Sequence, residues 1–290
     1  MRILFTGATG ILGSAAIPAL VAAGHHVDAV ARREADHRRL AALGASPVGA
    51  DLFDPTQIAA VAARAEVVFH YATAIPPLKD YPRREAWSMN DRLRSEATRL
   101  LVDAALVTGV ERFVQQSITF IYADGGDRWL DEEAPIGPVR ENLRSALDAE
   151  AEVDRFRLLG ATGVTLRHSL VYGQHASDEY VAAIRAGEIV IQGSGSNLVA
   201  SIHVDDVATS LVAALDAPDG VYNVSDDLPV TAWEYNASLA GLLGVDAPRR
   251  VPSSGPVISH RVSSRKFRET TGWAPRHPSV VEGWPSAISG

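Results

Sequence analysis

Three glycines near the start of the chain have the spacing of a turn that binds phosphate. Gly7, Gly10 and Gly13 lie between the apolar run Arg2–Thr6 and an alanine-rich run that begins at Ile11. Glycine permits a tight turn and lets backbone N–H groups approach an anion, and the N-terminus of a following helix adds donors and a positive dipole end. The spacing predicts that this turn holds the pyrophosphate of a dinucleotide. A strand-to-helix turn that merely requires glycine is the alternative interpretation.

Two arginines bear on which nicotinamide cofactor would be bound. An acidic residue at the end of the second strand would bind the adenosine ribose hydroxyls, whereas arginine pairs with a 2′-phosphate. Ala31 stands at the position of the acid, and Arg32 and Arg33 follow it. We therefore expect NADP(H) rather than NAD(H). In the alternative interpretation, Glu34 and Asp36 neutralise the two arginines, which then only form a solvated start to the next helix.

The elements that would position these residues alternate along the chain. Short apolar runs predict strands at Arg2–Thr6, His26–Ala31, Glu66–His70, Arg112–Ser117, Val164–His168 and Gly220–Val224. Helical patterns occupy Ile11–Ala23, Arg83–Thr108, Leu143–Leu159 and Val204–Leu215, and glycines follow the first three. Alternation of this kind predicts an α/β fold with a Rossmann-type, doubly wound parallel sheet.

The regular alternation loosens after Tyr172, where glycine-rich turns and proline-containing segments follow. We expect a dinucleotide-binding domain over residues 1–172, to which residues 201–226 return as part of the sheet. Residues 173–200 and 227–290 would form a smaller, C-terminal substrate-binding lobe.

Composition excludes several classes of protein. The chain has no cysteine, which rules out disulfides, thiolate nucleophiles and cysteine-ligated metal sites, and we expect no metal. A formal net charge of −8 argues against a nucleic-acid partner, because phosphate contacts need a basic face. No apolar run is long enough to span a membrane. We expect a cytoplasmic protein with a small-molecule substrate, either monomeric or homodimeric.

Several segments in chain order resemble the extended short-chain dehydrogenase/reductase superfamily, of the NAD-dependent epimerase/dehydratase type. They begin with the glycine turn at 6–13 and end near residue 285. The others are Asp51-Leu52, His70–Ala72, Leu166–Gly173, Ile202–Ala208, Gly220–Val224, Ser264–Phe267 and Thr271–Pro275. The resemblance implies that Asn90 braces the active site and that a defined set of residues binds the cofactor. That set is Gly7, Thr9, Gly10, Ile11, Leu12, Gly13, Asp51, Leu52 and Ala72. Arg32 and Arg33 join it through the charge argument given above.

The chain lacks the proton donor that this resemblance would lead us to expect. Members of the superfamily ordinarily use a Tyr-x-x-x-Lys helix and a serine or threonine. The lysine holds the nicotinamide ribose and lowers the pKa of the tyrosine, which then acts as acid or base near neutrality. The only lysines here are Lys79 and Lys266, and Ile75 and Val262 stand four residues before them. The chain therefore contains no Tyr-x-x-x-Lys motif.

Alignment with the superfamily pattern shows which residues occupy the three catalytic positions. Asn142 stands in place of the tyrosine, Ala146 in place of the lysine, and Ile118 in place of the hydroxyl residue. Ser117 or Thr119 would supply the hydroxyl if the register of the loop differs by one residue.

Three further side chains are candidate catalytic residues. Tyr71 follows the fourth strand and could donate a proton, or it could simply pack the loop. His168 titrates near neutrality in water and could act as acid or base, or it could make a structural hydrogen bond at the end of its strand. Asn142 can donate a hydrogen bond to a substrate oxygen but cannot exchange a proton at neutral pH.

These observations favour an atypical NADP(H)-dependent oxidoreductase that acts on a small carbonyl or a conjugated alkene with a non-standard proton donor. An alkene asks less of an acid, because its enolate can be protonated later or by water. Two alternatives stay open. One is a non-redox enzyme of the epimerase, dehydratase or cyclase type that retains the nucleotide. The other is a catalytically inactive NADP(H) sensor.

Overall fold

The computed structural model describes residues 1–288, which form two compact units. Unit 1 comprises Met1–Ile118, Arg140–Arg167 and Val207–Tyr222. Unit 2 comprises Thr119–Val139, His168–Asp206 and the chain from Asn223 onward. These boundaries differ from the expected ones, because segments 119–139, 168–172, 201–206 and 223–226 belong to unit 2. The reason is strand pairing, since β6 (Trp129–Leu130) pairs with β15 (Arg261–Val262) and β8 (Leu170–Tyr172) pairs with β11 (Ser201–His203).

A seven-stranded sheet in the order β12-β7-β5-β4-β1-β2-β3 confirms the expected α/β class. Its strands are β1 (Arg2–Thr6), β2 (His26–Val30), β3 (Ser46–Val48), β4 (Val67–His70), β5 (Arg112–Ile118), β7 (Thr162–His168) and β12 (Gly220–Val224). The pairs β1–β2, β1–β4, β2–β3 and β4–β5 are parallel. Strand order reverses between β1 and β4, and ligands of doubly wound sheets bind at the carboxyl ends of the strands beside such a switch point.

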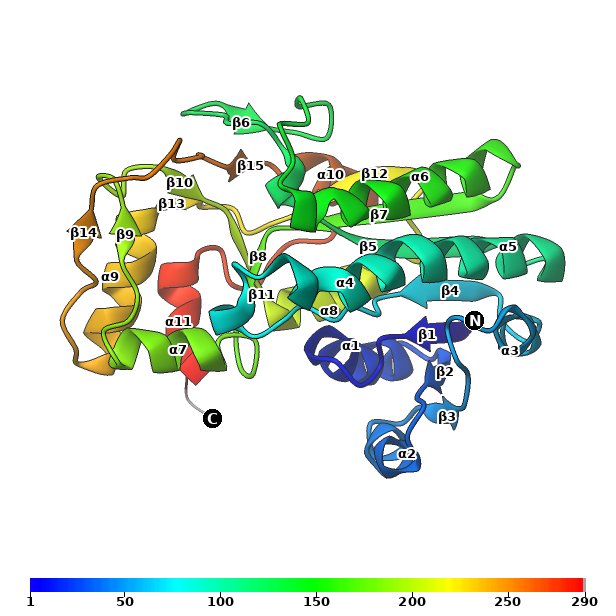
Figure 1. The fold of residues 1–290 in the computed structure, drawn as a ribbon. Coiled ribbons are helices and arrows are strands. Elements are labelled where there is room, and N and C mark those ends of the chain that lie inside the picture. Colours follow the sequence, from blue (N-terminus) through cyan, green and yellow to red (C-terminus); the bar gives the residue numbers. More distant parts are fainter. Residues whose placement is uncertain (289–290) are drawn as a thin grey trace. The chain divides into compact units, whose positions relative to one another are not determined.

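The helices of unit 1 connect these strands. They are α1 (Ile11–Ala22), α2 (Glu34–Ala42), α3 (Pro55–Ala62), α4 (Ser88–Arg92), α5 (Thr98–Thr108), α6 (Arg144–Leu158) and most of α8 (Val204–Ala213). In Figure 1, α5 and α6 run side by side, and α6 packs along β5. The apolar core of unit 1 includes Phe113 and Phe156, whose rings lie 5.8 Å apart between β5 and α6.

The single long helix expected over Arg83–Thr108 is interrupted. A 3₁₀ turn (Arg84–Trp87) precedes α4, and a π-helical turn (Leu93–Ala97) separates α4 from α5. His70 at the end of β4 donates from Nε2 to the carbonyl of Leu93 at 3.1 Å. A tertiary contact of this kind is one of the recognised causes of a local break in the helical hydrogen-bond ladder. Gly109 then ends α5 with φ of +78°, as its position after the helical pattern predicts.

Unit 2 consists of short strand pairs and helices around an aromatic core. Besides β6, β8, β11 and β15, its elements are α7 (Asp178–Arg185), β9 (Ile191–Gln192), β10 (Leu198–Val199), β13 (Val230–Thr231), α9 (Ala232–Leu243), β14 (Arg250–Val251), α10 (Arg265–Thr271) and α11 (Val280–Ile288). Trp284 of α11 packs edge-on against Tyr172 and Tyr235. Within residues 1–288, no helix combines the length and apolar character needed to cross a membrane.

Gly283 provides a test of this packing. A Cβ atom at Gly283 of α11 would overlap the hydroxyl of Tyr172, whereas a Cβ at Gly241 of α9 would meet open space. We expect Gly283→Ala to lower the free energy of unfolding by about 1–3 kcal/mol through overpacking. Gly241→Ala should raise it by about 0.5–1 kcal/mol, because alanine favours a helix interior. Urea denaturation of both variants measures the difference, and equal effects would contradict the packing of α11.

Candidate functional site

The glycine turn packs directly on the backbone that follows β4. Gly7 has φ of +78°, and a Cβ atom there would overlap the backbone of Tyr71 and Ala72. A Cβ at Gly13 would lie 2.5 Å from the carbonyl oxygen of Gly7. Both positions therefore require glycine for steric reasons. This close approach brings the turn and Ala72 together at the carboxyl ends of β1 and β4.

The N-terminus of α1 is open to an anion. Gly10 caps the helix with extended backbone angles and no side-chain hydrogen bond. The N–H of Gly10 donates to the Gly7 carbonyl at 3.0 Å, which closes the turn. The N–H groups of the first helical turn, at Ile11 and Leu12, have no intrahelical acceptor. They and the helix dipole favour a bound anion at this place.

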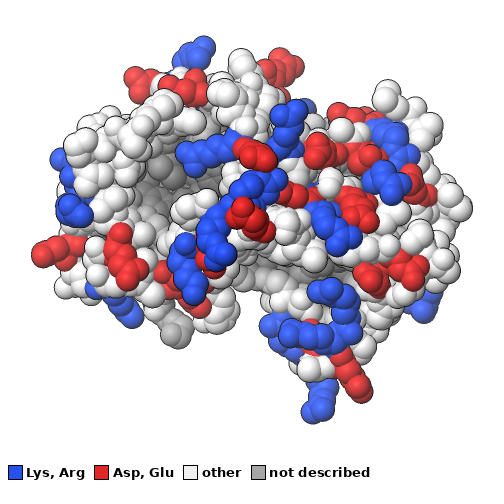
Figure 2. All heavy atoms as spheres, viewed as in Figure 1, with Lys and Arg blue, Asp and Glu red and all other residues white. Residues whose placement is uncertain are grey.

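Basic side chains gather over α2, as Figure 2 shows in the part of the surface that corresponds to α2 in Figure 1. Arg33 forms a two-pronged ion pair with Asp36, at 2.9 and 3.2 Å, so the expected neutralisation holds for this arginine. Arg32 is exposed. Arg39 donates to the carbonyl of Thr9 in the glycine turn. Sequence reasoning missed Arg39, because its contact with Thr9 joins residues thirty positions apart in the chain.

The other two expected cofactor residues lie in the turn before α3. Asp51 is exposed, and its side chain accepts a hydrogen bond from the N–H of Phe53 at 3.0 Å. Leu52 is partly buried against the apolar core of unit 1. Asp54 caps α3 by accepting from the N–H groups of Thr56 and Gln57. The Asp51 carboxylate thus stabilises a turn.

Tyr71 packs in the core of unit 1. It is 5% exposed, and its ring lies 5.7 Å from Phe5 and 6.3 Å from Phe69. Burial raises the pKa of the Tyr71 hydroxyl well above its ordinary value. The environment matches the packing interpretation, and it holds the phenol in its protonated form at neutral pH.

Ser117 is hydrogen-bonded to a buried ion pair between Glu150 and Arg167. Its hydroxyl donates to Oε1 of Glu150 at 2.5 Å. Arg167 binds both oxygens of the same carboxylate, at 2.9 and 2.6 Å, and all three residues are buried. The Ser117 hydroxyl is therefore committed to a charged acceptor that joins β5, α6 and β7.

Thr119 and His168 are both buried in unit 2. Thr119 follows β5 and donates to the Ser169 hydroxyl at 3.4 Å. His168 is 1% exposed, and burial lowers the pKa of its imidazole to about 3. The imidazole is neutral at pH 7 and carries no proton that it readily releases.

Asn142 lies in a 3₁₀ turn (Glu141–Leu143) directly before α6 and is partly exposed. Ion pairs and a hydrogen bond connect the residues beside Asn142 to Arg84 and Asp91. Arg84 pairs with Glu141 at 3.1 Å and with Asp91 at 2.7 Å, and Asp91 also accepts from the Ser145 hydroxyl at 2.8 Å. The backbone of this turn is thus tied to α4.

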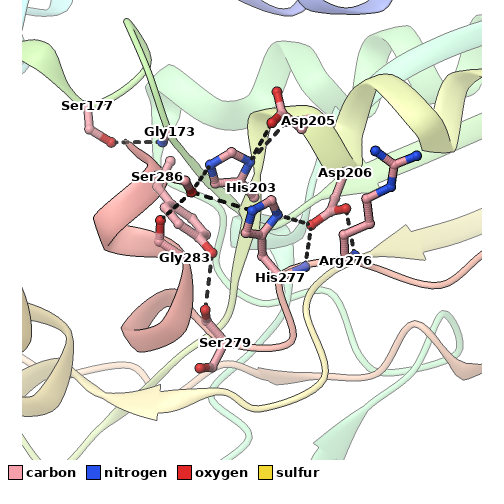
Figure 3. Close-up of polar contacts among 11 residues, drawn as sticks. Gly173, Ser177, His203, Asp205, Asp206, Arg276, His277, Ser279, Gly283 and Ser286 are labelled. Carbon is pink, nitrogen blue, oxygen red and sulfur yellow. Dashed lines mark hydrogen bonds and ion pairs between the residues drawn. The ribbon is translucent and has the colours of Figure 1, made fainter. Parts of the chain in front are cut away.

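A histidine cluster in unit 2 fixes the last helix (Figure 3). Asp206 accepts from the N–H groups of Arg276 and His277, at 2.7 and 3.0 Å, and from Nδ1 of His277 at 3.0 Å. The His277 ring stacks on His203 with centroids 3.8 Å apart. Ser286 of α11 lies 3.3 Å from Nε2 of His203. These contacts join α11 to the end of β11 and the start of α8.

The five candidate catalytic side chains share one property: none is set up to deliver a proton at neutral pH. The Tyr71 pKa is raised and the His168 imidazole is neutral. Ser117 and Thr119 are buried hydroxyls that donate to other side chains. An asparagine amide does not titrate in this range.

Comparison with known proteins places the chain among nicotinamide-dependent enzymes. The model of the NAD dependent epimerase/dehydratase family matches residues 3–225. The chain is 34% identical to the 3-diazoavenalumate denitrifying reductase of a Streptomyces species, over 98% of this chain and 99% of the relative. It is 28% identical to the UDP-glucose 4-epimerase of Mycolicibacterium smegmatis, over 98% and 96%. The structure of MoeE5 with UDP-glucuronic acid and NAD superimposes with a TM-score of 0.83 and 27% identity, over 99% of this chain and 98% of that one.

Buried histidines predict that acid destabilises the protein. Burial lowers the pKa of His70 to about 4 and of His168 to about 3, and it also lowers the pKa of His203. Between these values and the unfolded pKa near 6.5 the unfolded chain binds more protons, so stability is lost as the pH falls below 6.5. Each fully buried histidine should contribute a slope of about 1.4 kcal/mol per pH unit.

Urea denaturation at a series of pH values between 7 and 5 measures this slope. His70→Gln should reduce it by about 1.4 kcal/mol per pH unit. His175→Gln serves as the control, because the His175 side chain is 73% exposed. An unchanged slope in His70→Gln would contradict the lowered pKa of His70 as a cause of the acid sensitivity.

Proposed function

Because the chain belongs to the NAD dependent epimerase/dehydratase family, we propose that it is an NADP(H)-dependent reductase whose hydride acceptor takes no proton from a side chain. One contrast carries the proposal. The glycine turn is complete, whereas the chain contains no Tyr-x-x-x-Lys motif. A general acid typically contributes about 10²–10⁴ in rate, so a carbonyl reductase without one would be severely impaired. A reaction that needs no general acid would keep its rate without one.

The residues of unit 1 fit a dinucleotide. Gly7, Gly10 and Gly13 leave room for a pyrophosphate against the backbone, and Ile11 and Leu12 direct N–H groups to it. Ala72 lies beside the turn and would face the ribose of the nicotinamide half. When bound, the reduced cofactor supplies a hydride.

Charge at the end of β2 favours the phosphorylated cofactor. Ala31 is buried where an acid would select NAD(H), and Arg32 is exposed and available for a 2′-phosphate. Arg39 lies against Thr9 of the glycine turn and adds a second cation. Arg33 contributes less, because Asp36 already neutralises it. MoeE5, by contrast, was solved with NAD.

A diazo compound is the substrate class that best fits a site without an acid. The Streptomyces relative is named as a reductase that removes nitrogen from a diazo substrate. An aryl diazonium carbon that accepts a hydride forms a C–H bond and loses its C–N bond, and the C–N electron pair leaves with N₂. Charge balances, because the cation and the hydride give two neutral products, and no proton enters. Reduction of a ketone instead leaves an alkoxide that must be protonated.

In this reaction the chain's own residues bind and orient the two reactants. The partly exposed amide of Asn142 stands where the tyrosine would be, and it donates a hydrogen bond to the substrate without transferring a proton. Arg84, Glu141 and Asp91 hold its turn in place. Tyr71 is buried with a raised pKa and His168 is buried and neutral, so neither side chain would exchange a proton during the reaction.

A conjugated alkene is the second candidate substrate, since its enolate can take a proton from water. The missing acid disfavours reduction of a small carbonyl. We also rank epimerisation, the activity named for the mycobacterial relative, below diazo reduction. A sensor that binds the cofactor without turnover would have the same glycine turn and no activity on any of these compounds.

A substrate panel tests the proposal. We expect enzyme-dependent oxidation of NADPH with the aryl diazonium ion freshly prepared from an aromatic amine, release of N₂, and transfer of deuterium from labelled NADPH to the carbon that carried nitrogen. Reactions without enzyme correct for direct reduction by NADPH. Turnover of ketones or enones with none of the diazonium would overturn the substrate class. Tight NADPH binding without turnover of any compound would favour a sensor.

Arg32 provides a test of cofactor choice. We expect Arg32→Ala to weaken NADPH binding by about 1.5–3 kcal/mol through loss of a charge-assisted contact, with little effect on NADH. Arg38→Ala removes the same charge from an exposed position on α2 and is the matched control. Calorimetric titration measures the four affinities. Equal losses for NADPH and NADH in Arg32→Ala would rule out a 2′-phosphate contact.

The missing acid can be restored by design. We expect the double variant Asn142→Tyr/Ala146→Lys to gain ketone reduction by a factor of about 10²–10⁴ over the unmodified enzyme, because it recreates the tyrosine–lysine pair. Asn142→Phe/Ala146→Lys is the control, since it has the same bulk without a hydroxyl. The rates at which both double variants and the unmodified enzyme reduce a panel of small ketones measure the gain. A gain that the phenylalanine variant shares would show that acid catalysis is not the cause.

A further inference from the structure

Arg94 is a buried cation without a carboxylate partner. It is 2% exposed, and its Nη2 donates to the neutral side chain of Gln116 at 3.3 Å. Its Nε has no hydrogen-bond partner among residues 1–288, and none of the ion pairs formed by those residues includes it. Burial lowers the pKa of Arg94 to about 10, against the distant carboxylates of Asp91 and Glu150, so the side chain is charged at neutral pH. A buried charge of this kind is costly unless something compensates it.

Arg94 lies at the carboxyl ends of β4 and β5, where doubly wound sheets bind ligands. Its neighbour Leu93 accepts a hydrogen bond from His70 at the end of β4, and Gln116 is near the end of β5. Leu93 and Arg94 belong to the π-helical turn, a rare geometry that occurs frequently at functional sites. Arg94 therefore lies in the interior, at the edge of the sheet where a ligand would bind.

A second unsatisfied donor lies one helical turn before Arg94. Asn90 is fully buried, and its Nδ2 has no hydrogen-bond partner within the described part of the chain. Its Oδ1 accepts from the N–H of Ala74 at 3.3 Å, two residues beyond Ala72. Residues four apart share a helix face, so Asn90 and Arg94 present two donors beside the segment expected to meet the nicotinamide ribose.

Helix α6 lacks the lysine that members of the superfamily ordinarily carry at the position of Ala146. Ala146 of α6 is fully buried at the position of the superfamily lysine. α6 packs against the π-helical turn, and Ser145, the residue before Ala146, is bonded to Asp91 of α4. One positive charge is therefore missing from α6, and another is present on the element that packs against it.

We propose that Arg94 performs the task of the absent lysine, and that its guanidinium, with the amide of Asn90, binds the ribose oxygens of the nicotinamide half of the dinucleotide. This inference rests on the proposed cofactor. Two donors match hydroxyl oxygens, which accept hydrogen bonds. The pair fixes the nicotinamide end of the cofactor and supplies no proton, in keeping with a reaction that uses none.

Calorimetric titration with two ligands tests the proposal without any turnover. NADPH contains the nicotinamide half, whereas adenosine 2′,5′-bisphosphate contains only the adenosine half. We expect Arg94→Gln to weaken NADPH binding at least about tenfold, the lower range for a lost charge-assisted hydrogen bond, and to leave the bisphosphate unaffected. Unchanged NADPH affinity, or equal losses for both ligands, would overturn the role of Arg94.

A compensating variant separates this role from a structural one. Arg94→Gln/Ala146→Lys returns a cation to α6 and should recover most of the lost NADPH affinity, whereas Arg94→Gln/Ala146→Met should not. Failure of the lysine to recover affinity would count against the proposal. If Arg94→Gln does not fold, Arg94→Lys replaces it, and we expect a smaller loss for NADPH alone. A wild-type chain that binds neither ligand would refute the proposed cofactor, while tight binding of NADPH by wild type and Arg94→Gln alike would refute only the inference.

Discussion

The contact between the glycine turn and the backbone after β4 is the constraint on which unit 1 depends. A side-chain carbon at Gly7 would overlap Tyr71 and Ala72, so β1, the turn and β4 can only come together around glycine. This contact places the N-terminus of α1 at the point where strand order reverses. It also brings the backbone of Tyr71 against the turn, while the Tyr71 ring packs beside Phe5 and Phe69 in the core.

Much of unit 1 could be predicted from the sequence because its signals are local. Strand and helix limits follow from runs of apolar residues and from glycines such as Gly109, which ends α5 with a positive φ. The glycine spacing and the two arginines indicated the proposed cofactor roles from the sequence alone. The π-helical turn was missed because its cause is tertiary: His70 donates to the carbonyl of Leu93, twenty-three residues away. The same limit applies to Arg39, since its contact with Thr9 spans thirty residues.

The candidate catalytic residues show where sequence reasoning ends. Residue type identified Ser117 and His168 as groups capable of chemistry, but burial and partners decide what they can do. Glu150 accepts the Ser117 hydroxyl within an ion pair with Arg167, and no spacing in the sequence indicates that pairing. The absence of Tyr-x-x-x-Lys, in contrast, is a plain fact of the sequence. It proved to be the more informative observation, because the buried surroundings of the other candidates agree with it.

Unit 2 is assembled from three separate stretches of the chain, and this has a consequence for its biosynthesis. Its first stretch contains β6, whose partner β15 comes more than a hundred residues later, and Arg261 donates to the carbonyl of Asp127 across 134 residues. Trp284, one of its largest core side chains, lies in the final helix. The chain must therefore be synthesised to beyond Trp284 before this unit can close. Contacts so distant in sequence form slowly, so the nascent chain exposes apolar strands such as β8 and β11 for longer than a locally folding protein would.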